Sequence, residues 1–275
     1  MTSGLSRNNG EKYYTDQKVA EKSIDIFTKI IEPKIGDLIL EPSAGNGAFS
    51  NLLFDRFQNV IALDIEPEDE KILKQDFFTF KPKSTQKIHS IGNPPFGRQS
   101  SLAKQFIKKA SEFSTTISFI LPKSFKKASF QKAFPPTFHL EYSEDVPKNS
   151  FRLENKVYDV PCVFQIWIKK SFPRDTDKLE KPTYFSFVTK EQPHDFSIRR
   201  VGGTAGTIDF ETKDKSKQSH YFIKLNYDIE TFGGVDSFLE SYRNNVKFLE
   251  GNTVGPKSIS KPELILALNS LYIFF

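Results

Sequence analysis

An apolar run that leads directly into a turn of small residues constrains the fold of this chain more than any other feature. The run covers 38–40, and the turn that follows, 41–48, contains Gly45 and Gly47. Glycine permits a tight turn and a close approach of the backbone to a ligand. The pattern therefore predicts a buried strand that turns sharply into a helix, in an α/β sheet that binds a ligand at the carboxyl end of this strand.

The segments before and after this turn alternate between strand and helix patterns. A helix is expected to begin after Thr15 or Asp16, either of which can cap its first turn. Further strands are expected at 60–64, 87–92, 117–121, 138–140 and 162–168. The alternation continues through residue 134, which predicts a mostly parallel sheet. The last two strands follow each other with no helix between them, so we expect an antiparallel hairpin at one edge.

The composition changes near 171–182, where polar residues and prolines gather. We therefore expect two parts, 1–170 and a small α+β extension at 171–275. Strands are expected at 196–201 and 221–225, and helices at 235–248 and 261–272. The extension is a candidate substrate-recognition region.

The overall charge and the single cysteine narrow the class of protein. The net charge of +5 fits a polyanionic partner without requiring one. Cys162 cannot form a disulfide within the chain, and the polar N-terminus has no apolar core of a signal peptide. We therefore expect an intracellular, cytoplasmic protein, with a nuclear location left open, and no membrane span.

A second motif, Asn93-Pro94-Pro95-Phe96, ends the strand at 87–92 and is expected at the same sheet edge as the glycine turn. An exocyclic amine on an aromatic ring is a poor nucleophile, because its lone pair is delocalised into the ring. The side-chain oxygen of Asn93 and the carbonyl of Pro94 can accept both N–H groups and stabilise the charge that develops on nitrogen. Proline holds φ, which aims the carbonyl, and Phe96 offers a flat face for an extruded base.

The glycine turn itself limits the choice of cofactor. It lacks the Gly-x-Gly-x-x-Gly pattern of dinucleotide sites. Glu41 would repel a pyrophosphate and suits a cationic ligand, whereas Asp64, at the end of the next strand, suits ribose hydroxyls. A cationic adenosine derivative without phosphate is S-adenosylmethionine (SAM).

The motifs at 41–49, Asp64, Asp76-Phe77 and Asn93–Phe96, in this order, resemble the class I SAM-dependent amino-methyltransferases. The closest likeness is to the adenine-N6 group, with an Asn-Pro-Pro-Phe motif, and it covers about 13–168. It implies a Rossmann-like class I methyltransferase sheet. It also implies that 41–47 hold the methionine part, Asp64 the ribose, and Asp76 the adenine amino group, with Phe77 against the ring. The implied cofactor contacts are Tyr14, Thr15, Glu41, Ser43, Ala44, Gly45, Gly47, Asp64, Ile65, Asp76, Phe77 and Asn93.

Contacts with the substrate are expected from basic and aromatic side chains. Residues 98–132 carry eight basic side chains and one acidic side chain, a local charge of +7. Lys123, Lys126 and Lys127 follow the strand at 117–121 and are expected to hold phosphates. Phe151, in a loop before the last strand, resembles a family position that contacts the target base. The four histidines and Cys162 have no metal-binding spacing, so no metal is expected.

The expected function is SAM-dependent methylation of adenine N6 in nucleic acid, with DNA preferred over RNA by family analogy. Three alternatives remain open: an RNA adenine-N6 methyltransferase, a protein glutamine N5-methyltransferase, and a non-catalytic SAM-binding partner module. Glutamine methyltransferases carry Asn-Pro-Pro-Tyr, so Phe96 and the local positive charge count against that alternative. The intact Asn93 and Phe96 count against a non-catalytic module.

Overall fold

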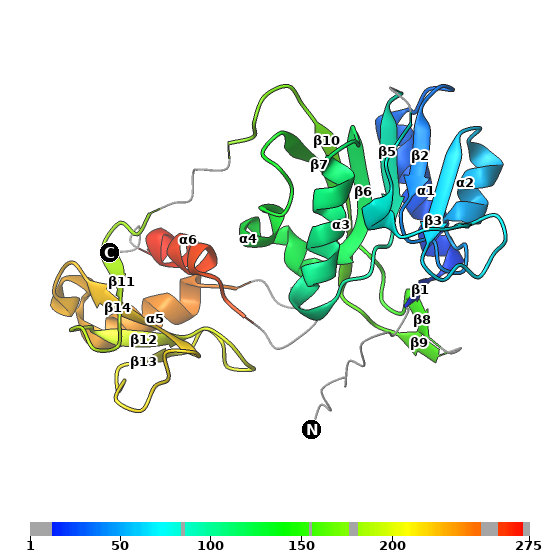
Figure 1. Ribbon diagram of the computed structural model, residues 1–275. Helices are drawn as coiled ribbons and strands as arrows, with labels where there is room; N and C mark the ends of the chain where they lie inside the picture. The colour runs from blue at the N-terminus through cyan, green and yellow to red at the C-terminus, as the bar shows by residue number, and fades with distance from the viewer. Residues whose placement is uncertain (1–12, 84–85, 154–155, 176–180, 249–257, 272–275) are drawn as a thin grey trace. The chain divides into compact units, whose positions relative to one another are not determined.

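The computed structural model describes residues 13–83, 86–153, 156–175, 181–248 and 258–271. The chain divides into two compact units, Met1–Thr176 and Asp177–Phe275, each with its own core (Figure 1). The first unit contains both sequence motifs and is described first.

A seven-stranded sheet forms the centre of the first unit. Its strand order is β4-β3-β2-β5-β6-β10-β7. β2 pairs in parallel with β3 and β5, β3 with β4, and β5 with β6, whereas β10 is antiparallel to both of its neighbours. The predicted mostly parallel sheet with an antiparallel hairpin at one edge is confirmed. The strands are β2 (Leu38–Glu41), β3 (Val60–Asp64), β4 (Leu73–Lys74), β5 (Ile88–Gly92), β6 (Thr116–Pro122), β7 (Phe138–Asp145) and β10 (Cys162–Lys169).

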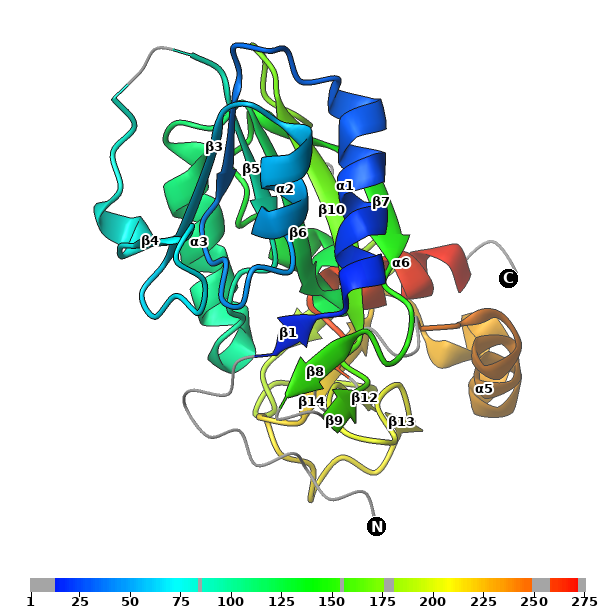
Figure 2. The ribbon, with the colours of Figure 1, turned by 90° about the vertical axis from the view of Figure 1, so that its right-hand side faces the viewer.

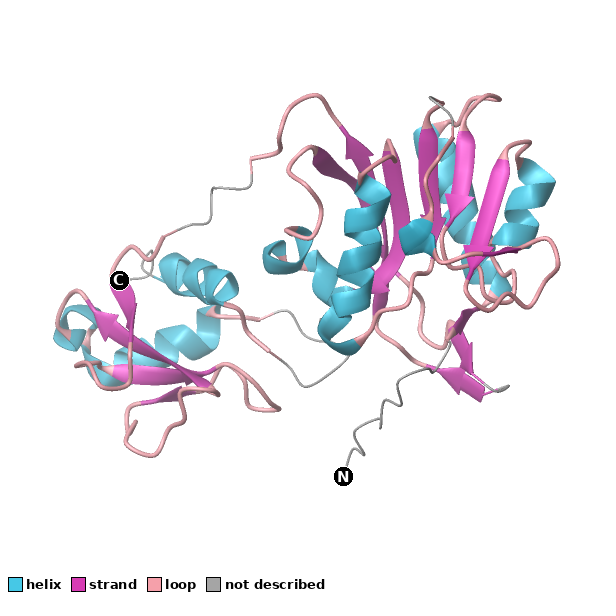
Figure 3. Ribbon diagram, in the orientation of Figure 1, coloured by secondary structure: helices cyan, strands magenta, loops and turns pink. Residues whose placement is uncertain are grey.

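Helices cover both faces of this sheet (Figures 2 and 3). α1 (Gln17–Ile31) and α2 (Ser50–Arg56) pack on one face, in a cluster that includes Phe27 and Leu53. α3 (Ser101–Ser111) packs on the other face through Phe106 and Ile107. Asp16 begins α1, because its carboxylate accepts a hydrogen bond from the Lys18 amide at 3.0 Å. The shorter helices are η1 (Phe77–Thr79), η2 (Arg98–Ser100), η3 (Lys123–Lys126) and α4 (Ala128–Gln131).

A small antiparallel sheet joins the start of the unit to the segment between β7 and β10. It consists of β1 (Tyr14–Thr15), β8 (Phe151–Leu153) and β9 (Lys156–Tyr158), in the order β1-β8-β9. The prediction of a loop around Phe151 is therefore wrong. Phe151 is 1% exposed and belongs to the same apolar cluster as α1, which holds β8 in place as a strand. Tyr14 pairs with Arg152, and Thr15 pairs with Phe151.

The second unit contains a four-stranded antiparallel sheet and two helices. The strand order is β11-β14-β12-β13. Strands were predicted at 196–201 and 221–225, and both are present and pair directly, whereas β11 and β13 were not foreseen. The final residue of the helix predicted at 261–272 lies outside the described residues. The elements are β11 (Phe185–Val188), β12 (Phe196–Arg199), β13 (Ile208–Asp209), β14 (His220–Leu225), η4 (Ile229–Phe232), α5 (Gly234–Asn245) and α6 (Lys261–Leu271).

Two negative findings apply to the described residues alone. None of their helices has the length and apolar character that crossing a membrane requires. Nor do three or more His, Cys, Asp or Glu side chains gather there in a group that could hold a metal ion.

Candidate active site

The glycine turn and Asp64 meet at the carboxyl ends of β2 and β3. Gly45 has a φ of +53°, which glycine adopts at little cost, and its amide donates to the Asp64 carboxylate at 2.8 Å. The Ala44 amide donates to the Leu63 carbonyl at 2.9 Å, and the Gly47 amide closes the turn onto Ala44. The structure thus brings together two segments whose association the sequence predicted.

Asp64 has polar contacts on both carboxylate oxygens. Oδ2 accepts from Gly45, and Oδ1 accepts from the Glu66 amide at 2.8 Å. These backbone donors hold the carboxylate at the sheet edge, and each oxygen retains a lone pair for a further donor. Ile65, the next residue, has a side chain that is 62% exposed, so it offers an apolar surface beside the carboxylate.

Glu41 is an acidic side chain almost fully enclosed at the end of β2. It is 2% exposed, and its Oε2 has no hydrogen-bond partner among the described residues. The absence of a side chain at Gly92 leaves room for Glu41, because a Cβ on Gly92 would lie 3.2 Å from Glu41 Cγ. The φ of Gly92, +148°, also favours glycine at this position. Burial raises the pKa of Glu41 to about 8; hydrogen bonding to Ser50 opposes this rise, and the charge of Asp64 adds to it. A cation beside this carboxylate would relieve the cost of ionising it.

The Asn93–Phe96 segment leaves β5 at the same edge. The Asn93 Nδ2 donates to Thr15 Oγ1 at 3.0 Å and to the Tyr13 carbonyl at 3.5 Å. Its Oδ1 is buried and has no hydrogen-bond partner among the described residues. A buried acceptor without a donor is costly, and here it is the atom that the predicted chemistry requires.

The backbone on either side of Asn93 is also held. The Ser43 hydroxyl donates to the Asn93 carbonyl at 3.4 Å, which links the glycine turn to this segment. Pro94 is buried and Pro95 is exposed. The Phe96 carbonyl accepts from the amides of Leu102 and Ala103 at 3.1 and 3.2 Å, at the start of α3. Phe96 is half-buried and packs against two of the apolar clusters of the unit.

Asp76 and Phe77 occupy the turn after β4. The Asp76 side chain accepts from the Phe78 amide at 2.9 Å and caps η1. Phe77 is 2% exposed and stacks on Phe106, with centroids 5.1 Å apart. The implied contact of Phe77 with a cofactor ring is corrected, because its face is already covered by the core. The exposed neighbour is Phe78, at 38%.

Tyr14 lies over the glycine turn, where the resemblance implied a contact. A Cβ on Gly45 would be 3.2 Å from the Tyr14 ring. The Tyr14 hydroxyl donates to the Glu68 carboxylate, and the Glu68 amide donates to the Gly45 carbonyl at 3.1 Å. Partial burial and then the hydrogen bond to Glu68 raise the pKa of Tyr14 to about 12. The acidic segment after β3 therefore packs on the turn through Glu68.

A cavity of about 610 Å³ opens beside the glycine turn. It is lined by 14–17, 46–48, Asn51, Leu52 and Arg152. Arg152 reaches it because β8 pairs with β1, and it forms an ion pair with Asp16 at 3.6 Å. Sequence reasoning missed Arg152. The runs 151–153 and 156–158 are separated by two residues, the loop length of a tight hairpin, and this spacing is the local feature that points to the sheet.

The three lysines after β6 do not form the predicted patch of free ammonium groups. Lys123 pairs with Asp145 at 2.9 Å, and Lys126 pairs with the same carboxylate. Burial opposes ionisation of Asp145, but hydrogen bonds from both lysines outweigh it and lower its pKa. Lys127 is only 7% exposed. The expectation of three phosphate contacts is corrected. Asp145 offsets the charges of Lys123 and Lys126, and Lys127 is too buried to present its ammonium group at the surface.

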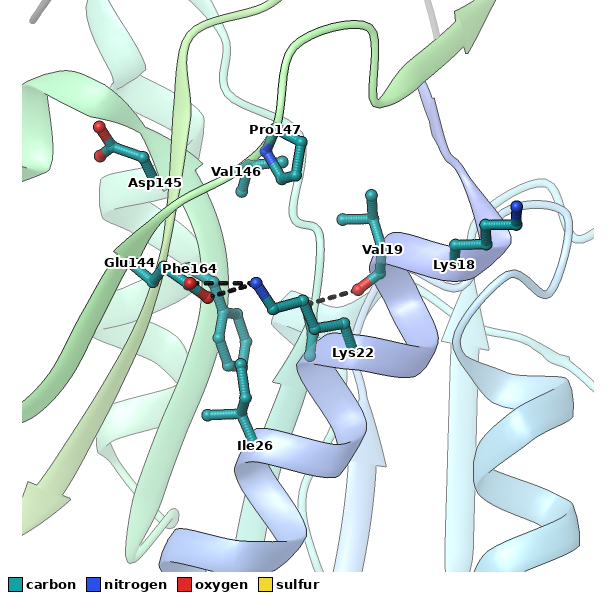
Figure 4. Close-up of a pocket in the computed structure, with 10 residues that line it drawn as sticks. Lys18, Val19, Lys22, Ile26, Glu144, Asp145, Val146, Pro147 and Phe164 are labelled. Carbon is teal, nitrogen blue, oxygen red and sulfur yellow. Dashed lines mark hydrogen bonds and ion pairs between the residues drawn. The ribbon is translucent and has the colours of Figure 1, made fainter.

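A smaller hollow of about 180 Å³ lies between α1 and the strands β7 and β10 (Figure 4). Val19, Ile26 and Phe164 contribute apolar walls, and Lys22 forms an ion pair with Glu144 at 3.0 Å across it. No predicted site residue lines this hollow. The candidate site is therefore the edge formed by the glycine turn, Asp64 and Asn93–Phe96.

Neither a protein-family model nor a curated protein matches the chain. Among solved structures, it is similar to the candidate RNA methyltransferase PH1948 from Pyrococcus horikoshii, at 18% identity over 61% of this chain and 92% of that one, with a TM-score of 0.46. TrmN from Thermus thermophilus is 18% identical over 56% of this chain, with a TM-score of 0.39, and the matched part spans about half (49%) of its length. A SAM-dependent methyltransferase from Anabaena variabilis is 11% identical over 59% of this chain and 89% of its own, with a TM-score of 0.43. At such low identity the likeness concerns the fold alone.

Proposed function

We propose that this protein is a SAM-dependent methyltransferase that acts on the N6 amine of adenine in nucleic acid, with DNA as the preferred substrate. One observation carries the proposal. The buried Oδ1 of Asn93 has no partner among the described residues, and it lies in a segment that Ser43 links to the glycine turn. This acceptor lacks a hydrogen-bond donor, and the amine of a target base would supply one.

The residues at the sheet edge fit the proposed cofactor. SAM, when bound, supplies a methyl group on a positively charged sulfur. Glu41 offers a buried carboxylate with an unpartnered oxygen, which suits a cationic ligand. Asp64 offers two oxygens for ribose hydroxyls, and the positive φ of Gly45 allows the backbone to approach the ligand closely.

The Asn93–Phe96 segment would hold the amine that accepts the methyl group. Asn93 Oδ1 and the Pro94 carbonyl would accept its two N–H groups, which favours a pyramidal nitrogen and stabilises its developing positive charge. The ring of Pro94 and the hydrogen bonds from α3 to Phe96 keep these acceptors from moving. Phe96 is only half-buried, so part of its side chain would be available to a base removed from its stack. The proposal requires no general base before transfer.

The test is transfer of a labelled methyl group from SAM to unmethylated DNA, RNA and a protein extract in parallel, followed by nucleoside digestion of the labelled polymer. We expect the label in DNA, as N6-methyldeoxyadenosine. Label in RNA as N6-methyladenosine would show that RNA and not DNA is the substrate, and would leave the proposed chemistry unchanged. Label in a glutamine side chain of protein, or none with any substrate, would refute the proposal.

A further inference from the structure

We propose that Arg152 and Asp16 form a binding site for the α-amino acid end of SAM, in which Arg152 binds the carboxylate and Asp16 binds the ammonium group. The inference rests on the part of the proposed function that concerns SAM binding. The pairing of β1 with β8 brings the two residues together (Figure 2).

The cavity of about 610 Å³ beside the glycine turn carries one charge of each sign. Among the described residues that line it, Arg152 is the one basic side chain, Asp16 is the one acidic side chain, and the others are uncharged. Nη2 of Arg152 lies 3.6 Å from Oδ2 of Asp16. A phosphate in the cavity would be attracted by the guanidinium but repelled by the carboxylate beside it. An α-amino acid suits both groups, because its carboxylate and its ammonium are attached to the same carbon.

The guanidinium of Arg152 is available to a ligand. The side chain is 60% exposed, and within the described part of the chain the guanidinium has one partner, Asp16. At 3.6 Å this ion pair is too long for a hydrogen bond, so it leaves the N–H donors of the guanidinium free for an acceptor. An exposed pair of this kind contributes little to stability and rearranges at little cost. A carboxylate can accept from two of these N–H groups at once, in a geometry that matches the guanidinium.

Both residues are held by the backbone around them. Arg152 pairs with Tyr14 across β8 and β1, and the Asp16 amide donates to the Ser150 carbonyl at 2.9 Å. Oδ1 of Asp16 accepts from the Lys18 amide at 3.0 Å at the start of α1, which leaves Oδ2 for Arg152 and for a cation of the ligand. The side chain of Asp16 is 30% exposed, so a ligand can reach it.

The cavity adjoins the part of the site that the proposed function assigns to the cofactor. Asn46 and Gly47 of the glycine turn line it, and so does Tyr14, whose ring lies over Gly45. Asp64, which suits the ribose, does not line it. SAM joins its adenosine to an amino acid through the sulfur. An adenosine held at Asp64 therefore leaves the amino acid end to enter the cavity.

The test combines substitutions in the protein with ligands that lack one or both charged groups of the amino acid end. Calorimetric titration measures the Kd of each full-length variant for three ligands: SAM, decarboxylated SAM, which keeps the ammonium, and 5′-methylthioadenosine, which lacks both groups. We expect Arg152→Gln to weaken SAM binding at least about tenfold and to leave the other two Kd values within about twofold of wild type. Arg152→Lys keeps the charge but loses the paired N–H groups, so it should weaken SAM binding less.

Asp16→Asn tests the ammonium contact separately. Asparagine also caps helices, so α1 should remain intact. We expect this variant to bind SAM and decarboxylated SAM at least about threefold more weakly, and to bind 5′-methylthioadenosine as wild type does. The matched control is Arg56→Gln, which should change none of the three Kd values. Arg56 is also ion-paired with α1, through Glu21 and Asp25, but it does not line the cavity.

Equal weakening of SAM and decarboxylated SAM by Arg152→Gln would show a structural effect and overturn the inference. An unchanged Kd for SAM would overturn it as well. If Arg152→Gln then bound a labelled oligonucleotide more weakly in fluorescence anisotropy, Arg152 would contact a phosphate instead. These titrations require no methyl transfer. If the wild-type protein binds SAM with the expected pattern but transfers no methyl group, the proposed function is refuted and the inference stands.

Discussion

We expect the enclosed carboxyl of Glu41 to make SAM binding depend on pH in a range where most carboxyls are already ionised. Its pKa is raised to about 8, because burial disfavours the charge. If a cationic ligand binds only the ionised form, affinity follows the ionised fraction, which rises roughly 75-fold between pH 5.5 and 7.5 for such a pKa. We therefore expect the Kd for SAM to fall by that factor over this range.

Calorimetric titration of SAM at half-unit intervals of pH measures this dependence. The upper limit of pH 7.5 keeps the α-amino group of the ligand largely protonated. The control ligand is 5′-methylthioadenosine, which carries no charge in this range and should bind with a flat profile. The control variant is Glu41→Gln, which should bind SAM more weakly and with little dependence on pH.

The stability of the ligand-free protein gives an independent measure of the same group. The folded-state pKa lies above the unfolded value of 4.5, so above pH 4.5 the folded protein holds a proton that the unfolded chain has lost. This contribution to stability is present below pH 4.5 and is lost as the pH rises towards 8. Between pH 5.5 and 7.5, the free energy of unfolding should fall by about 2.5 kcal/mol relative to Glu41→Gln. The free energy of unfolding is measured by urea denaturation at each pH. If it changed equally with pH in wild type and Glu41→Gln, and the Kd for SAM did not change with pH, the reasoning would be refuted.

Three further substitutions test other parts of the site and the sheet. Asn93→Ala should lower methyl transfer at least about 100-fold with only a modest change in the Kd for SAM, measured by labelled transfer and calorimetry, and full activity would contradict its role. Phe151→Ala should lower the free energy of unfolding, measured by urea denaturation, by about 3–5 kcal/mol, because the residue is 1% exposed. If Phe151 instead contacted the target base, the substitution would raise the KM for nucleic acid and leave the stability unchanged. Burial lowers the pKa of His89 despite its contact with Asp37, so the unfolded chain takes up a proton first as the pH falls below about 6.5. Stability should decline there, and His89→Gln should show a smaller decline in urea denaturation between pH 6.5 and 5.

The sequence alone determined the strands at the centre of the sheet and the position of its two motifs. The predicted boundaries of β3 agree with the structure residue for residue, the apolar run at 38–40 lies within β2, and Asp16, one of the two predicted caps, caps α1. These features depend on short-range chemistry: apolar runs, a side chain that caps its own helix, and glycines where φ is positive. Because parallel strands end at one edge, the order of the motifs also brought Asp64 and Asn93 to the same side of the sheet.

Only the tertiary structure decided which side chains are free to act. Phe77 and Phe78 are adjacent and chemically identical, yet packing against α3 buries the first and leaves the second partly exposed. From the sequence, Lys123 and Lys126 are expected to be free to bind phosphates, but in the structure Asp145 at the end of β7 forms ion pairs with both. The Asn93 amide donates a hydrogen bond to Thr15, 78 residues earlier in the chain. Each outcome arises from contacts between segments far apart in sequence, and no local pattern of residues encodes which distant group will be the partner.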